Sequence, residues 1–141
     1  MAFKIFIDTN IIVDFFVASR LLHQDAVKMV NAIEDGLLKG YVSESVINTT
    51  SYLVRKSSNI DGYRKQMLNV MTILNVLPCT NDIINAGFRS AKNDLEDAVL
   101  YQIALAGKMD YFITSNIKDF KRLEQPLLPV ITPKEILTII V

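Results

Sequence analysis

Apolar and polar residues alternate along the chain in a way that predicts strands and helices in turn. Residues 3–7 form a short run rich in aromatic and β-branched side chains, which is typical of a strand buried on both faces. Other short apolar runs lie at 41–42, 75–78, 111–113 and 129–131. Between these runs, apolar residues recur with helical spacing at 11–16, 22–35, 44–56, 61–74, 81–91 and 95–107. The alternation predicts an α/β fold: a three-layer sandwich with a central, mostly parallel sheet of four to five strands flanked by helices.

Local signals place some of the helix ends and inner faces. Gly36 and Gly40 can end the second predicted helix, because glycine is common just after the last helical turn. Asp61 can cap the fourth helix. In the helix after residue 80, Ile84 and Phe88 share one apolar face, and we expect both to point into the core.

Composition and charge exclude several classes of protein. The 141 residues suit one domain spanning 1–141, and no apolar run approaches the roughly 20 residues of a membrane span. Lys4 and Asp8 interrupt the apolar start of the chain, so no signal peptide is expected. The one cysteine, Cys79, cannot form an internal disulfide and fits the reducing cytoplasm. Lys plus Arg and Asp plus Glu both number 15, so any affinity for phosphates must come from local patches.

Asp8 follows directly on the first apolar run, and Thr9 and Asn10 come after it. In an open parallel sheet, ligands bind at the carboxyl ends of the strands. A carboxylate at such a place is poorly explained by packing, although capping of the next helix would also account for it. Asp8 is therefore a candidate ligand and a candidate cap.

A second acidic stretch places Asp94, Glu96 and Asp97 at the start of a helix that is apolar in almost every direction. A helix apolar all round is a buried helix. Asp94 could cap this helix, and the other two acids could favour its dipole. Crowded carboxylates beside a core are costly unless a cation neutralises them, so a metal site explains the stretch equally well.

A third polar stretch, at 114–119, follows the apolar run at 111–113 and includes Thr114, Asn116 and Asp119. Two apolar strands thus deliver polar groups at their carboxyl ends, with an acidic helix start between them in the sequence. Oxygen ligands of this kind recruit Mg²⁺, which can lower the pKa of a bound water and neutralise charge on a phosphodiester. With one histidine and one cysteine, the chain is poorly suited to a zinc site or a Cys–His nucleophile.

Taken together, the three stretches resemble the PIN-domain family over nearly the whole chain. The matching segments are 7–10, 94–98 and 114–120. The resemblance is closest to small bacterial members, many of which are ribonuclease toxins of toxin–antitoxin pairs. It implies a Mg²⁺- or Mn²⁺-dependent endoribonuclease that hydrolyses phosphodiester bonds in RNA, with an antitoxin protein as a partner. Whether the protein forms a homodimer is left open.

The resemblance also implies roles for individual residues. It matches Asp8 and Asp97 to metal-binding acids and Asn116 to a position that is often Asp or Asn. The expected catalytic residues are Asp8, Asp94, Asp97 and Asn116. The expected metal ligands are Asp8, Asp94, Asp97 and Asp119. Residues expected to support them are Thr9, Asn10, Thr49, Glu96 and Thr114.

One acid of the family pattern is missing. Many relatives carry a Glu in the helix after the second strand, and the best match here is Thr49. Glu44 lies several residues earlier, on a different face of that helix. The replacement supports an alternative function: a catalytically weak or inactive PIN scaffold that acts as an RNA- or protein-interaction module.

RNA would have to be held by local basic groups that flank the acids, although such groups also serve simply to keep a surface soluble. The candidates are Arg55, Lys56, Lys118, Lys121 and Arg122. Two other classes fit less well. A haloacid-dehalogenase-type phosphatase needs a second Asp where this chain has Asn10, and a nucleotide-binding signalling domain needs a Gly-rich phosphate loop.

Overall fold

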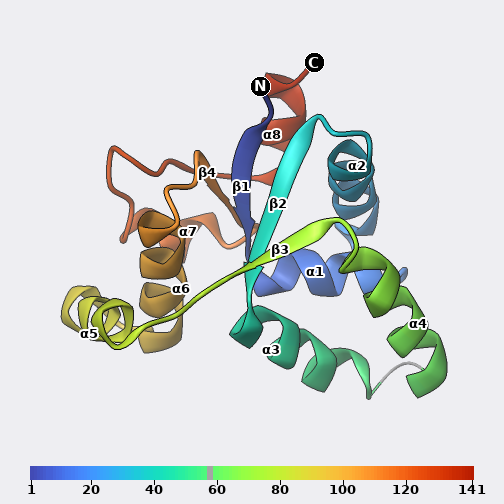
Figure 1. Ribbon diagram of the computed structural model, residues 1–141, viewed down its shortest axis with the longest axis horizontal. Coiled ribbons are helices and arrows are strands. Elements are labelled where there is room, and N and C mark those ends of the chain that lie inside the picture. The colour runs from blue at the N-terminus through green and yellow to red at the C-terminus, as the bar shows by residue number, and fades with distance from the viewer. Residues whose placement is uncertain (57–58) are drawn as a thin grey trace.

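The computed structural model describes residues 1–56 and 59–141 (Figure 1). The strands of this part of the chain are β1 (Phe3–Ile7), β2 (Leu38–Ser43), β3 (Leu74–Leu77), β4 (Tyr111–Ile113) and β5 (Val130–Ile131). Its helices are α1 (Thr9–Phe16), α2 (His23–Glu34), α3 (Glu44–Val54), α4 (Ile60–Val70), α5 (Asn81–Ser90), α6 (Leu95–Ala106), α7 (Ile117–Lys121) and α8 (Pro133–Ile139).

The strands form one sheet in the order β3-β2-β1-β4-β5, and every pairing within it is parallel. β1 occupies the centre, and helices flank the sheet (Figure 1). The predicted α/β sandwich is therefore confirmed. The sheet of the described residues has five strands, where four to five were predicted, and it is entirely parallel. Over the described ranges, none of the helices has the length and apolar character needed to cross a membrane.

The core is built around the two central strands. Phe6 of β1 stacks on Phe112 of β4, with 5.3 Å between the ring centroids. Phe112 also contacts Phe120 of α7, at 4.5 Å between centroids, and all three rings are fully buried. Ile7 and Ile113 are paired across the two strands, so β1 and β4 end at the same level. These contacts place the residues that follow the two strands side by side.

One predicted helix end is wrong. Gly40 does not end α2 but lies inside β2, which begins at Leu38, earlier than the pattern indicated. A Cβ at Gly40 would lie 2.7 Å from Leu74 Cδ2 and 2.8 Å from Ile33 Cδ1. Any larger residue here would have to displace the ends of these two side chains, so glycine fits the close packing at this point of the sheet. Gly36 follows the end of α2 as predicted, and its φ of 81° is the left-handed conformation that glycine adopts readily.

The cap of α4 also differs from the prediction. Asn59 precedes the helix, and its Oδ1 accepts hydrogen bonds from the backbone N–H groups of Asp61 and Gly62, at 2.8 and 3.2 Å. Asp61 instead lies in the first turn and pairs with exposed Arg64 at 3.1 Å. Both residue types can cap a helix, so the sequence alone does not distinguish between two candidates two positions apart.

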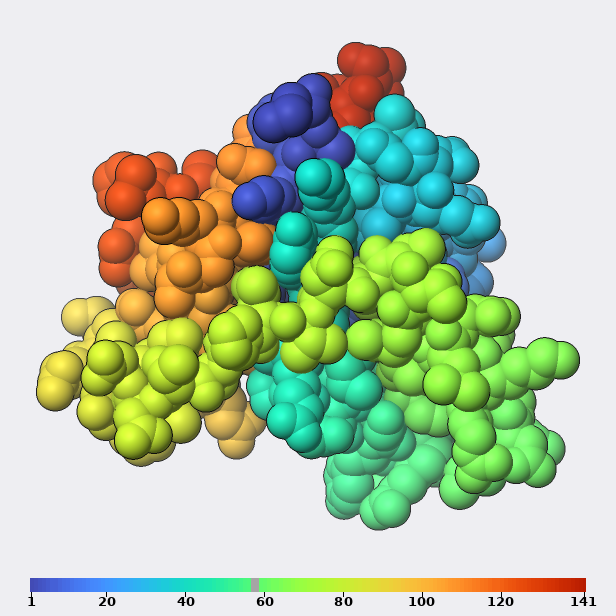
Figure 2. Space-filling model, in the orientation of Figure 1, coloured from blue at the N-terminus to red at the C-terminus, as the bar shows by residue number. Residues whose placement is uncertain are grey.

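Ile84 and Phe88 are not core residues, contrary to expectation. Their exposed fractions are 42% and 56%. The reason is the path of the chain after β3, which crosses the molecule to α5, where it packs on α6 rather than on the sheet (Figures 1 and 2). In Figure 2 the lime segment at 74–80 runs over the surface between these regions. Only part of the apolar face of α5 is therefore covered.

The packing of α5 on α6 depends on Gly87, and this leads to a prediction. A Cβ at Gly87 would lie 2.7 Å from Val99 Cγ2 and 2.9 Å from Val99 Cα, so backbone would have to move. We expect Gly87→Ala to lower the free energy of unfolding by about 1–3 kcal/mol, as measured by chemical denaturation. Gly62→Ala is the matched control, since a Cβ there meets nothing within 4 Å. Equal stability of the two variants would contradict the close α5–α6 contact.

Candidate active site

Asp8 is buried where β1 ends and α1 begins, with 4% of it exposed. Its Oδ1 accepts a hydrogen bond from the backbone N–H of Thr9 at 2.8 Å, so Asp8 does cap α1. Its Oδ2 accepts a hydrogen bond from the hydroxyl of Thr114 at 2.8 Å, because β1 and β4 are neighbours and end together. Burial raises the pKa of Asp8, against the effect of these hydrogen bonds, and the charge of Asp94 raises it further.

Two more carboxylates lie at the start of α6. Oδ1 of Asp94 accepts a hydrogen bond from the backbone N–H of Asp97 at 2.9 Å, so Asp94 caps the helix. Asp94 and Asp97 line a cavity of about 220 Å³ together with Asp119 of α7. We call this hollow the acidic cavity, and its lining residues are Lys92, Asn93, Asp94, Asp97, Asp119, Arg122 and Leu123.

The carboxylates influence one another strongly. The pKa of Asp97 is raised to about 7, first because the half-buried carboxyl loses solvation. The negative charges of Asp94, Asp8 and Asp119 raise this pKa further, in that order. Three separate elements therefore bring four aspartates into electrostatic contact: the start of α1, the start of α6, and α7.

Thr114 and Asn116 connect these elements by hydrogen bonds. The fully buried hydroxyl of Thr114 donates to Asp8 and accepts from the backbone N–H of Asn116 at 2.9 Å. The side-chain Nδ2 of Asn116 donates to Oδ2 of Asp119 at 3.0 Å. A chain of hydrogen bonds thus runs from Asp8 to Asp119, and it holds the strand end and the α7 loop in a defined relation.

The chemistry of this set suits a hard divalent cation, since it consists of carboxylate oxygens and an amide. Across residues 1–56 and 59–141, however, no three acidic, histidine or cysteine side chains are already arranged as metal ligands. A cation would have to draw the aspartates closer together. Its charge would offset the repulsion that raises the pKa of Asp97.

The expected basic residues are distributed unevenly around this set. Arg122 lines the acidic cavity, whereas Lys121 forms an ion pair with Glu124 at 3.0 Å, and Lys118 is exposed on α7. Lys92 also lines the acidic cavity, and the sequence analysis missed it. Its only signal was its place two residues before Asp94, and a single lysine near an acidic stretch has no periodicity to mark it.

Arg55, Lys56, Asn10 and Thr49 lie apart from the acidic cavity. The two basic residues follow the last turn of α3, and all four side chains are exposed. In the part of the chain that the structure describes, no hydrogen bond or ion pair joins Asn10 or Thr49 to the aspartates. Their supporting roles stay predictions.

Comparison with known families identifies the domain. A family model described as PIN domain matches residues 4–118, which is most of the chain. The chain belongs to the PIN-domain family. The resemblance found in the sequence is therefore confirmed, and the matched region includes Asp8, the start of α6 and Asn116. No match to a curated protein was found at the level of sequence.

Solved structures with the same fold include three from bacteria. A toxin–antitoxin complex from Klebsiella pneumoniae is similar over 91% of this PIN domain and 96% of its own chain, at 23% identity and a TM-score of 0.66. VapBC2 from Rickettsia felis, bound to a promoter DNA fragment, is similar over 92% of this PIN domain and 98% of its own chain, at 17% identity and a TM-score of 0.66. VapC20 from Mycobacterium tuberculosis, a Sarcin–Ricin loop cleaving toxin, is similar over 81% of this PIN domain and 92% of its own chain, at 14% identity and a TM-score of 0.63. At these identities the likeness shows the fold.

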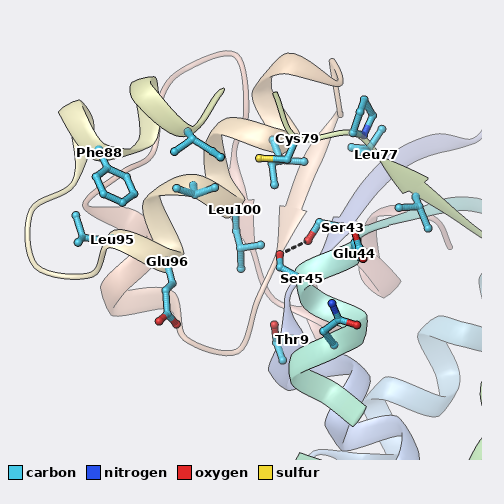
Figure 3. A pocket seen from close by; sticks show the side chains of 16 residues that line it. Thr9, Ser43, Glu44, Ser45, Leu77, Cys79, Phe88, Leu95, Glu96 and Leu100 are labelled. Carbon is cyan, nitrogen blue, oxygen red and sulfur yellow. Dashed lines mark hydrogen bonds between the residues drawn. The ribbon is translucent and has the colours of Figure 1, made fainter. Parts of the chain in front are cut away.

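This PIN domain also has a larger hollow on the other side of α6, which we call the apolar groove (Figure 3). Its volume is about 950 Å³. Thr9, Glu44 and Glu96 lie toward its polar end, so the start of α6 separates the groove from the acidic cavity. The lining residues are Thr9, Ser43, Glu44, Ser45, Asn48, Val76, Leu77, Pro78, Cys79, Ile84, Phe88, Leu95, Glu96, Val99, Leu100 and Ile103.

Proposed function

We propose that this PIN domain is a Mg²⁺- or Mn²⁺-dependent endoribonuclease and the toxin of a toxin–antitoxin pair acting in the cytoplasm. The observation that carries the proposal is the electrostatic contact among Asp8, Asp94, Asp97 and Asp119 at the carboxyl edge of the sheet. Helix capping accounts for Asp8 and Asp94. It does not account for the gathering of all four carboxylates, because their mutual repulsion destabilises the native state. Membership of the PIN-domain family and structural neighbours that include an RNA-cleaving toxin support the same function.

The four aspartates would hold the ion, and Thr114 and Asn116 position Asp8 and Asp119 for it. When bound, a divalent ion supplies charge neutralisation at the scissile phosphate and lowers the pKa of a coordinated water. Asp97, with a pKa of about 7, holds a proton part of the time in the metal-free site, and a bound cation would favour its ionised form. Lys92 and Arg122 lie at the cavity where they can bind phosphate oxygens beside the cleaved bond.

The antitoxin partner is supported by the neighbours that are toxin–antitoxin complexes and by the apolar groove. Phe88 and Leu95 leave 56% and 48% of their surfaces exposed there, an area that favours burial by a protein. Glu44 and Glu96 at the polar end favour a segment that carries a basic side chain. Because the start of α6 borders both hollows, such a segment would end beside the acidic cavity.

The test measures cleavage and metal binding together. Labelled single-stranded RNA is incubated with the protein in Mg²⁺, in Mn²⁺ and in chelator, and Mn²⁺ binding is titrated by calorimetry. We expect cleavage with either ion and none in chelator. We expect Asp97→Asn to weaken Mn²⁺ binding at least about tenfold, since it removes a charged ligand. Asp82→Asn, an exposed acid in the first turn of α5, is the control and should bind Mn²⁺ as the wild type does.

The replacement of the family Glu by Thr49 gives the experiment a second outcome. An absence of cleavage for every RNA tested, with Mn²⁺ binding that is indifferent to Asp97, would reject the nuclease. The PIN scaffold would then act as an interaction module, for which the apolar groove is the available surface.

A further inference from the structure

An exposed aromatic side chain near the end of α3 is covered by two cations. Tyr52 leaves 52% of its surface exposed. The guanidinium carbon of Arg55 lies 4.9 Å from the centroid of its ring, and the Lys56 ammonium nitrogen lies 4.6 Å from it. Spacings of three and four residues explain why these side chains meet on a helix, and each cation is attracted to the face of the ring.

Neither cation is committed to a carboxylate. Within residues 1–56 and 59–141, neither Arg55 nor Lys56 forms an ion pair. By contrast, Arg64 pairs with Asp61, and Lys121 pairs with Glu124. In a chain with no net charge, two unpaired cations beside an exposed ring form a local anion-binding surface with a π face.

The helix that carries Tyr52 is firmly held. Val54 is buried, and the hydroxyl groups of Ser51 and Tyr63 share a hydrogen bond of 2.6 Å that joins α3 to α4. Tyr63 in turn packs edge-on against Phe16 of α1, with 5.1 Å between ring centroids. The backbone beneath Tyr52 is therefore fixed on both sides, which lowers the entropic cost of binding a ligand there.

Tyr52 lies on the same face of α3 as two residues that line the apolar groove. Ser45 and Asn48 of α3 line the apolar groove, as does Thr9, which follows Asp8. Tyr52 is four residues beyond Asn48 and seven beyond Ser45, so the three side chains share one face of α3. Tyr52 is thus displaced from Asn48 by about 6 Å along the helix axis. A strand of RNA that leaves the groove beside Thr9 and follows this face of α3 would reach Tyr52.

We propose that Tyr52, Arg55 and Lys56 form a binding site for one unpaired base of the RNA and its flanking phosphates. The base stacks on the Tyr52 ring, while the two cations turn from the ring to the phosphate oxygens. Stacking on aromatic rings combined with basic side chains is the usual way in which proteins hold single-stranded nucleic acid. This inference rests on the proposed function, because it assigns part of the RNA path to a site away from the acids.

The test measures binding of a labelled single-stranded RNA by fluorescence anisotropy in chelator, so that no cleavage occurs. We expect Tyr52→Ala to weaken binding by about 5- to 100-fold, and Tyr52→Phe, which keeps the ring, to bind within about twofold of wild type. The loss caused by Tyr52→Ala should disappear with an abasic oligonucleotide of the same length. Arg55→Ala and Lys56→Ala should each reduce the slope of log K against log salt concentration by about one, which corresponds to the loss of one phosphate contact. Arg64→Ala, an exposed and ion-paired control, should change neither quantity.

Three outcomes would overturn the inference: unchanged binding by Tyr52→Ala, an equal loss with the abasic oligonucleotide, or no RNA binding by the wild type. Thermal melts of each variant confirm folding, which an exposed position should tolerate. Failure of the two proposals can be distinguished. Cleavage by the wild type with Tyr52→Ala binding normally rejects the stacking site alone. Tyr52-dependent binding without cleavage in Mg²⁺ or Mn²⁺ rejects the nuclease and supports the stacking site.

Discussion

Replacing Asp8 with Asn is expected to abolish metal-dependent RNA cleavage while the fold persists. The variant loses a carboxylate oxygen at the carboxyl end of β1, which is a proposed metal ligand. Weakened cation binding should lower the cleavage rate by at least about a hundredfold, since a bound ion contributes several kcal/mol to such reactions. The measurement is the initial rate of RNA cleavage in saturating Mn²⁺, for wild type and variant at equal protein concentration.

The stability of Asp8→Asn should equal or exceed that of the wild type without metal. An Asn Oδ1 can still cap α1 through the N–H of Thr9, and its amide can donate to the Thr114 hydroxyl in place of the present bond. The variant also removes a buried carboxyl group, and burial has raised the pKa of that group because it disfavours the charged form. Asp35→Asn, at an exposed position at the end of α2, controls for loss of an acid elsewhere. Cleavage by Asp8→Asn within threefold of the wild type would rule out Asp8 as a ligand.

The ionisation of Asp97 is expected to lower the stability of the metal-free protein as pH rises from about 4 to about 7, by an amount that solvent screening of this half-exposed carboxyl reduces. The carboxyl of Asp97 has a pKa of about 7 in the folded protein and 3.8 as its ordinary value. Between these values the folded state binds more protons than the unfolded state, so raising the pH favours unfolding. The contribution of Asp97 is complete below the lower value and lost above the higher one.

Thermal melts of wild type and Asp97→Asn across this range isolate the effect. The difference between their Tm values removes contributions from other groups, including Glu124, whose lowered pKa acts in the opposite direction. The variant should show a weaker fall with pH, and saturating Mg²⁺ should reduce the fall in the wild type, because the cation stabilises the ionised acids. Parallel pH profiles for the two proteins would show that Asp97 is not electrostatically coupled to Asp94, Asp8 and Asp119.

Much of the fold follows from local patterns. The run at 3–7 predicts β1 because its apolar and β-branched side chains suit a strand covered on both faces, and the structure has the strand at these residues. Asp94 was a predicted cap, and its side chain does accept the N–H of Asp97. Errors arose where neighbouring residues offered equal signals, as at Asn59 and Asp61, or where a glycine fits close packing within a strand and does not end a helix, as at Gly40.

The candidate site was also predictable in part from local patterns. Acids that follow parallel strands must lie at one edge of the sheet, so the sequence places Asp8 and the 114–119 stretch together once the strands are assigned. Lys92 escaped notice because its position at the acidic cavity depends on how the turn before α6 is placed. The hydrogen bonds that join Thr114 to Asp8 and Asn116 to Asp119 depend on side-chain geometry that no sequence pattern encodes.

The sequence by itself determined the order of strands and helices from β1 to β4, the strand-end acids and the membership of the PIN-domain family, but not helix α7. Those properties depend on local periodicity, capping and residue type, which are written along the chain. The tertiary structure alone decided that Ile84 and Phe88 border an open groove and that Asp97 has a pKa near 7. An apolar face shows that a residue can be buried, but only the placement of α5 on α6 decides what covers it. A carboxyl carries the same charge anywhere in the sequence, and its pKa changes only when folding removes water and brings other charges near.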